Sequence, residues 1–291
     1  MARFKLTNEN YYTPEANKRY MSVSQFKEFA GNPFKPHCES AAFKKYKGEI
    51  AEEKTTPLLV GSYVDSYFEG TLDRFREENP DIYKKTGDKG LKAEYVQAEE
   101  IIERINRDPL FTEYMSGQKQ VIMTAKLFDV DWKIKMDSYH PGKMIVDLKV
   151  MKDMEPTFSK KYGHMVDFIR YYGYDIQGAI YQAVVEKKTK KKLPFYIACA
   201  TKETTTNIEL IEIEQEYLDK ALDYVRDNIQ RVLSVKEEIE EPRRCGKCPI
   251  CRESKLLKKP ITLSSIIPYK EIETDVANDG SDFEIYIPDA I

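Results

Sequence analysis

The sequence lacks the features of membrane and secreted proteins, and it has little net charge. No window approaches the roughly 18 uncharged apolar residues of a membrane span, and the N-terminus has no apolar core of a signal peptide. The formal net charge of the 291 residues is only -3, so no overall basic field attracts nucleic acid. We therefore expect a cytoplasmic protein without membrane attachment, in which any nucleic-acid binding depends on local patches.

Cysteine is also scarce, with five residues in the whole chain, which is too few for a disulfide framework. In a reducing compartment, clustered cysteines indicate metal ligands before disulfide bridges. Three of the five, Cys245, Cys248 and Cys251, are separated by two-residue gaps. Their placement therefore carries more information than their number.

Hydrophobic residues make up 41% of the chain, which is enough for a sizeable core, and their period changes along the sequence. Helical spacing and strand alternation each occur in several segments, and Pro141-Gly142 supplies a tight turn between two of the strands. The pattern predicts an α/β (α+β) fold. The expected helices are 22–31, 37–46, 57–75, 91–107, 166–187 and 215–240, and the expected strands are 120–128, 131–139, 143–150, 193–200 and 207–212.

Four segments are expected along the chain. Residues 1–56 form an N-terminal helical segment that carries Cys38 and begins loosely, and residues 57–240 form the core. Residues 241–259 carry the cysteine cluster and pack back on the N-terminus. Residues 260–291 form an acidic tail, which we expect to be partly ordered at best.

The hairpin DSYHPGKMIVDLK, from Asp137 to Lys149, places two carboxylates and an ammonium group close together. Residues two apart in a strand share a face, so Asp147 and Lys149 point to one side, and Asp137 on the preceding strand reaches the same side. Neighbouring carboxylates repel unless a cation intervenes, and oxygen ligands suit Mg²⁺ or Mn²⁺. The alternative is a solvated hairpin with an ion pair that contributes under about 1 kcal/mol.

A second triplet of the same form, Asp131-Trp132-Lys133, shows how readily D-x-K arises by chance in a chain that is 33% charged. It opens a strand and no acid on a partner strand precedes it. We therefore do not regard it as a candidate site.

Taken with an acid on an earlier helix and Q-x-x-x-Y on a later one, the hairpin resembles the PD-(D/E)xK nuclease superfamily. It is most similar to the phage-type RecE-like exonuclease branch, which is related to the RecB and AddB nuclease domains. The resemblance implies a restriction-endonuclease-like core with a central mixed β-sheet flanked by helices. Gly61-Ser62-Tyr63-Val64-Asp65 matches the helix that carries the first metal ligand, with Asp65 where histidine is usual and Glu69 in reserve.

By this resemblance, the metal ligands are Asp65, Asp137, Asp147 and the Leu148 carbonyl, and Lys149 orients or deprotonates the attacking water. Gln177 and Tyr181 are four residues apart on one helical face and suit phosphate and base contacts, and Tyr174 and Arg170 are expected to continue that stripe. The alternative for this helix is a core tyrosine beside a solvated glutamine.

Cys38 is the best candidate for a fourth ligand to Cys245, Cys248 and Cys251. AddB-like nucleases hold a [4Fe-4S] cluster with one cysteine before the nuclease core and three after it, and this chain has the same split order. The final cysteine gap is shorter here than in AddB, so Zn²⁺ stays open, with His37 as an alternative ligand to zinc. Three reduced thiols in an exposed loop are the alternative.

The remaining cysteine and histidines have simpler interpretations. Cys199 is expected to be a buried strand residue, and His140 and His164 are expected at the surface. Lys160-Lys161 and the run from Lys187 to Lys192 either form positive walls of a DNA groove or offset helix dipoles.

These features predict an Mg²⁺-dependent exodeoxyribonuclease that degrades double-stranded DNA ends in phage-type recombination. The alternatives are a structure-selective endonuclease on the same fold and a non-catalytic DNA-binding module with a decayed site. By resemblance, the partners are double-stranded DNA ends, a single-strand annealing recombinase that the acidic tail would dock, and further copies of the chain in a homo-oligomeric ring. The favoured alternative for the tail is a disordered solubilising end.

Overall fold

The computed structural model describes residues 4–51, 55–87 and 89–265, and the chain divides after Glu253 into two units. The description below concerns the unit that ends at Glu253. The expected acidic tail lies largely outside the described residues. No helix in the described ranges combines the length and apolar composition that a membrane span requires.

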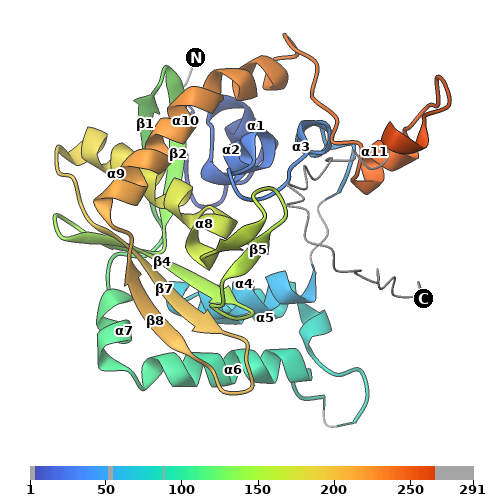
Figure 1. Ribbon diagram of the computed structural model, residues 1–291. Coiled ribbons are helices and arrows are strands. Elements are labelled where there is room, and N and C mark those ends of the chain that lie inside the picture. Colours follow the sequence, from blue (N-terminus) through green and yellow to red (C-terminus); the bar gives the residue numbers. More distant parts are fainter. Residues whose placement is uncertain (1–3, 52–54, 88, 266–291) are drawn as a thin grey trace, which may run out of the picture. The chain divides into compact units, whose positions relative to one another are not determined.

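A four-stranded mixed sheet forms the centre of this unit (Figure 1). Its order is β3-β4-β7-β8, and only the β4 and β7 pair is parallel. A parallel pair needs a long crossover connection, which the two helices between β4 and β7 supply. The expected mixed central sheet is confirmed. Its strands are β3 (Ser138–His140), β4 (Met144–Met151), β7 (Phe195–Thr201) and β8 (Ile208–Glu212).

Both faces of the sheet are covered, because alternate residues of its strands enter two separate hydrophobic cores. On β4, Ile145 belongs to one core, whereas Val146 and Leu148 belong to the other. The first core is built with helices that include α9 (Tyr174–Thr189) and α10 (Gln215–Lys236). The second is built with α4 (Thr56–Glu69), α6 (Ala93–Asn106) and α7 (Pro109–Tyr114). The face that carries Asp147 and Lys149 is therefore not simply solvated.

The strand expected at 131–139 is two strands that belong to different sheets. β2 (Val130–Met136) pairs with β1 (Val121–Leu127) in a separate hairpin, and the chain crosses to β3 at Asp137. The charged face of β2 is not exposed throughout, because Lys133 is only 1% exposed. Its ammonium group donates to the carbonyl of Tyr11 and to Oδ1 of Asn17.

The N-terminal segment contains three helices, α1 (Pro14–Arg19), α2 (Val23–Ala30) and α3 (Glu39–Tyr46). The hydroxyl of Ser22 accepts from the Gln25 N–H and caps α2, as its sequence predicts. The expectation of a loose beginning is wrong for α1, which Thr13 caps and Pro14 starts.

Two expected helices are interrupted at glycines with positive φ. The helix expected at 57–75 ends at Gly70 (φ +77°) and is followed by α5 (Leu72–Glu78). The helix expected at 166–187 is divided at Gly173 (φ +66°) into α8 (Phe168–Tyr172) and α9. Elements that the sequence did not predict are α1, α7, β5 (Thr157–Ser159), β6 (His164–Val166) and the 3₁₀ turn Pro80–Ile82. The cysteine segment ends in α11 (Pro249–Glu253), and a 3₁₀ turn, Leu263–Ser265, lies in the second unit.

Candidate active site

Asp137 and Asp147 meet where β2 gives way to β3. The antiparallel register of β3 and β4 pairs Ser138 with Val146, so the next residues outward, Asp137 and Asp147, are level with each other. Oδ2 of Asp137 accepts a hydrogen bond from the Leu148 N–H at 3.0 Å. The break between β2 and β3 therefore places Asp137 where the Leu148 N–H can fix its carboxylate beside Asp147.

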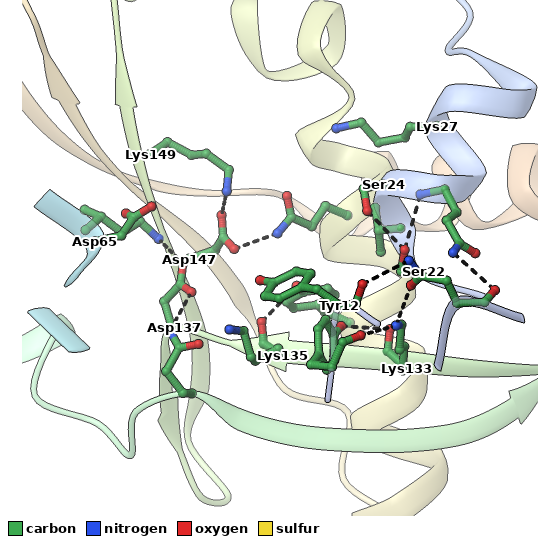
Figure 2. Close-up of a pocket in the computed structure, with 18 of the residues that line it drawn as sticks. Tyr12, Ser22, Ser24, Lys27, Asp65, Lys133, Lys135, Asp137, Asp147 and Lys149 are labelled. Atoms are coloured by element: carbon green, nitrogen blue, oxygen red, sulfur yellow. Dashed lines mark hydrogen bonds and ion pairs between the residues drawn. The ribbon is translucent and has the colours of Figure 1, made fainter. Parts of the chain in front are cut away.

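Asp147 is held between two side chains and is only 2% exposed. The Gln177 side-chain amide on α9 donates to Oδ1 of Asp147 at 2.6 Å, and the Lys149 ammonium group forms an ion pair with Oδ2. Figure 2 shows Lys149 pointing down onto the Asp147 carboxylate from above. Oδ2 is buried and has no hydrogen-bond partner beyond this ion pair, so it retains lone pairs for a further cation.

Asp65 comes from α4 and lines the same cavity as Asp137 and Asp147. Burial raises the pKa of Asp65 to about 7, and repulsion from Glu69 and Asp147 adds to this, although Lys149 opposes it. Burial and repulsion from Asp147 also raise the pKa of Asp137 well above its ordinary value. The protein therefore gathers carboxylates at a cost that a divalent cation would relieve.

The cavity that these residues line has a volume of about 540 Å³ and a mostly polar wall. Leu148, Lys149, Gln177 and Tyr181 line it too, so the structure brings together every residue expected to bind the metal or to take part in catalysis. Their catalytic roles stay predictions. The reserve ligand, Glu69, lines the cavity as well.

Burial alone would lower the pKa of Lys149, but the Asp147 and Asp137 carboxylates outweigh it and raise that pKa above its ordinary value.

Tyr181 is largely buried, with its ring in the core and its hydroxyl donating to the Lys135 carbonyl at 2.9 Å. Tyr181 is therefore a core tyrosine, as the alternative interpretation of this helix predicts, and it also lines the cavity.

Arg170 does not continue the stripe of Gln177 and Tyr181, because Gly173 places it on a separate helix. Its guanidinium pairs with Asp167, and both residues line another cavity. Tyr174 does remain near the site, with its ring centroid 5.4 Å from the Lys149 ammonium group. The basic run shows one local pairing, between Lys192 and Asp219 at 3.3 Å.

Several residues that line the cavity were not predicted from the sequence, because they lie in segments without a nuclease motif. Lys27 on α2 and Gln120 and Lys135 on or beside the β1-β2 hairpin all line the cavity. Burial, with a smaller effect of Lys149, lowers the pKa of Lys27 to about 8. The capping pattern at Ser22 predicts where α2 begins, but it does not predict which face of α2 turns toward the cavity.

The four predicted cysteine ligands form a second candidate metal centre. Their sulfur atoms all lie within 4.8 Å of one another, and Sγ of Cys38 is 3.5 Å from Sγ of Cys251. Among the described residues, this is the one set of three or more acidic, histidine or cysteine ligand atoms gathered so tightly; the carboxylates of the cavity are spread further apart. The centre joins α3, which Cys38 precedes, to the segment that ends in α11.

Backbone contacts prepare this cysteine centre for a cation. The N–H groups of Lys247 and Cys248 donate to Sγ of Cys245 at 3.4 and 3.3 Å and lower its pKa to about 6. Burial raises the pKa of Cys248 to about 12 instead, so the local fold favours the thiolate, which is the ligand form of cysteine, at Cys245. His37, the alternative ligand, packs its ring against Gly31.

The remaining expectations concern residues away from both centres. Cys199 is fully buried in β7, as predicted. His164 is exposed, as predicted. His140 is half-buried instead, and its Nε2 lies 2.8 Å from the Tyr114 carbonyl.

Comparison with known proteins decides the family. A family model described as "PDDEXK-like domain of unknown function (DUF3799)" matches residues 22–254. The chain belongs to this PDDEXK-like family. The predicted fold and the resemblance to the PD-(D/E)xK nuclease superfamily are thereby confirmed.

One solved structure is similar to this PDDEXK-like protein over almost its full length. It is a crystal structure described as a "putative exonuclease" from Eubacterium rectale, with 53% sequence identity and a TM-score of 0.85. The match covers 91% of this chain and 99% of the other. A search of curated proteins finds no match.

Proposed function

We propose that this protein is a divalent-metal-dependent deoxyribonuclease that acts as an exonuclease on double-stranded DNA ends. The observation that carries the proposal is the buried Asp147 carboxylate, fixed by Lys149 and Gln177 beside Asp137 and Asp65 in one polar cavity. Membership of the PDDEXK-like family and similarity to a chain described as an exonuclease support it.

The donor set fits a hard divalent ion such as Mg²⁺ or Mn²⁺, because it consists of carboxylate oxygens, one of them buried without a hydrogen bond. Asp65, Asp137 and Asp147 would hold the ion, with the Leu148 carbonyl as a further ligand. When bound, the ion supplies an acidified water and offsets the charge that develops on the phosphate. Gln177 holds the Asp147 carboxylate in position, and Lys149, whose protonated form the Asp147 and Asp137 carboxylates stabilise, orients the attacking water.

The test is digestion of end-labelled linear duplex DNA and of a covalently closed circle, each with Mg²⁺. The wild type should release mononucleotides from linear DNA and leave the circle intact, and Asp147→Ala should release none. Nicking of both substrates would favour an endonuclease, and retarded but intact DNA would favour a binding module.

For the cysteine centre, we propose a single four-coordinate ion, with Zn²⁺ as the best fit. With Zn–S bonds of about 2.3 Å, tetrahedral sulfurs are about 3.8 Å apart, whereas the iron atoms of a four-iron cluster push its ligands further out. The observed separations of 3.5 Å for Cys38 and Cys251 and 4.0 Å for Cys245 and Cys251 support the single ion. A brown protein that absorbs near 400 nm after anaerobic purification would instead establish the [4Fe-4S] cluster.

The biological setting that we propose is phage-type recombination, in which such an exonuclease works with a single-strand annealing recombinase. Co-purification of such a partner with the full chain, and its loss when residues 260–291 are removed, would test this. A ring-shaped homo-oligomer on DNA is tested by the mass of the protein in solution.

A further inference from the structure

A second cavity, of about 500 Å³, opens beside the carboxylate cavity, between α2, α3 and the end of α8. Ser24, Lys27 and Glu28 line both cavities, so the two are neighbours. We call the second cavity the α2-α3 groove; besides these shared residues, its lining includes Lys35, Cys38 and Tyr172.

The α2-α3 groove presents positive charge that the protein does not neutralise. In the described ranges, neither Lys27 nor Lys35 forms an ion pair with a carboxylate, and Lys45 at the rim pairs with Glu28 at 3.4 Å. Figure 2 shows the Lys27 side chain extended toward Lys149 across the top of the site. Two ammonium groups without a carboxylate partner, in a cavity beside a candidate nuclease site, suit the phosphates of a nucleic-acid backbone.

Aromatic rings alternate with these cations along the path from the groove to the carboxylates. The Lys35 ammonium group lies 5.6 Å from the centroid of the Tyr172 ring, and Tyr172 is 40% exposed. The Tyr172 ring is 5.9 Å from that of Tyr174, which in turn lies 5.4 Å from the ammonium groups of both Lys27 and Lys149. Interleaved cations and tyrosines are the arrangement that binds single strands, with phosphates on the lysines and bases stacked on the rings.

We propose that the α2-α3 groove holds single-stranded DNA next to the bond that is cut, so that an unpaired end reaches the carboxylates. Its volume is that of a small-ligand site, which admits part of one strand and excludes a paired duplex. This inference rests on the proposed function and specifies its substrate: the duplex must be frayed at its end before the strand enters.

One residue of the cysteine centre lines the same groove. Cys38 lines the groove directly, and α3, which it precedes, forms one wall. An ion held by Cys38 and the three C-terminal cysteines therefore fixes that wall, which connects the cysteine centre to strand binding.

Fluorescence anisotropy with a labelled oligo(dT) and with a blunt hairpin duplex tests the proposal without any divalent ion added, so that no cleavage occurs. Lys35→Ala and Tyr172→Ala should each weaken oligo(dT) binding by roughly five-fold or more. Lys35→Ala should also lower the slope of log Kd against log salt by about 0.7, the value for one phosphate contact on a single strand, whereas Tyr172→Ala should leave the slope unchanged.

Matched controls are Lys126→Ala, which removes an exposed lysine on β1, and Tyr217→Ala, which removes a tyrosine that is 38% exposed on α10. Both controls should bind within two-fold of the wild type. Equal oligo(dT) binding by the groove variants and the wild type would overturn the inference, as would an equal loss for the blunt duplex. If the groove variants bind oligo(dT) more weakly but the wild type does not cut DNA, the inference holds and the proposed function is rejected. If the wild type cuts DNA but the groove variants bind as well as it does, the proposed function holds and the inference is rejected.

Discussion

Single residues at the carboxylate site are held by contacts that a D-x-K pattern cannot show. Asp147 and Lys149 differ from Asp131 and Lys133 in what surrounds them. Both lysines line the cavity, but the Lys149 ammonium group meets a carboxylate, whereas the Lys133 ammonium group donates to a backbone carbonyl and an asparagine. The two triplets therefore provide a matched comparison within one chain.

Asp147→Ala and Lys149→Ala should each reduce DNA cleavage by about 100-fold or more, because each removes a charge that acts on the transition state. Titration calorimetry with Mn²⁺ should show lost metal binding for Asp147→Ala and retained binding for Lys149→Ala. The control is Asp131→Ala, an exposed position that should keep wild-type activity. Wild-type cleavage by either site variant would show that the chemistry lies elsewhere.

Asp175, which is only 8% exposed at the start of α9, should make stability depend on pH. Burial raises its pKa from 3.8 to about 6, so the folded state binds the proton more tightly than the unfolded state does. Its contribution to stability is full below pH 3.8 and is lost as the pH rises through 6. Asp175→Asn should therefore be more stable than the wild type at pH 7, by at most about 3 kcal/mol.

Thermal unfolding of both proteins at pH 7 and pH 5 measures this difference. The advantage of Asp175→Asn should shrink at the lower pH. An advantage that is absent at pH 7, or that grows on acidification, would contradict the assignment.

At the scale of elements, the sequence predicts most helices and strands but not how the chain passes between sheets. Alternation over 131–139 indicates one strand, because the local period is unbroken at Asp137, where the chain leaves β2 for β3. Likewise, the alternation rule assumes that a charged side chain points outward, and Lys133 does not. Lys27 was missed because its role depends on where α2 packs, which only tertiary contacts decide.

Packing between α9 and β7 should be sensitive to one added methyl group. A Cβ at Gly178 would lie 2.6 Å from Cδ1 of Phe195 and 2.9 Å from Cδ2 of Leu218. Gly178→Ala should therefore lower the free energy of unfolding by roughly 1–3 kcal/mol. Gly61→Ala on α4 is the matched control, because a Cβ there meets no atom within 4 Å and alanine favours a helix by up to about 1 kcal/mol. Denaturant unfolding should show opposite signs for the two variants.

At the scale of the whole molecule, the cysteine centre connects segments from opposite ends of the chain. Contacts around it reinforce the connection, since the Ser40 N–H donates to the Arg243 carbonyl at 3.1 Å and the Arg243 N–H donates to the Glu39 carboxylate at 2.8 Å. The split spacing of the cysteines was enough to predict this pairing from the sequence. The nature of the ion was not predictable, because it depends on sulfur separations.

Cys38→Ser should lose the bound metal and lower the unfolding temperature, because closing a loop of this length restricts the unfolded chain and the ligand is lost. Elemental analysis and thermal unfolding measure the two effects. The control is Cys199→Ala, which should keep the metal content of the wild type, since Cys199 lies in the core of β7. Unchanged metal content in Cys38→Ser would assign the metal to other ligands.

The order of the site along the chain has a consequence for the cell that makes the protein. The carboxylates, Lys149 and Gln177 come from three elements and the junction of β2 and β3, and the groove wall that carries Cys38 meets its partners only at Cys245 to Cys251. On the proposed function, a nascent chain that has not yet emerged past those residues cannot assemble the complete enzyme. The groove wall that carries Cys38 can therefore be fixed only after the segment with the three later cysteines has been synthesised.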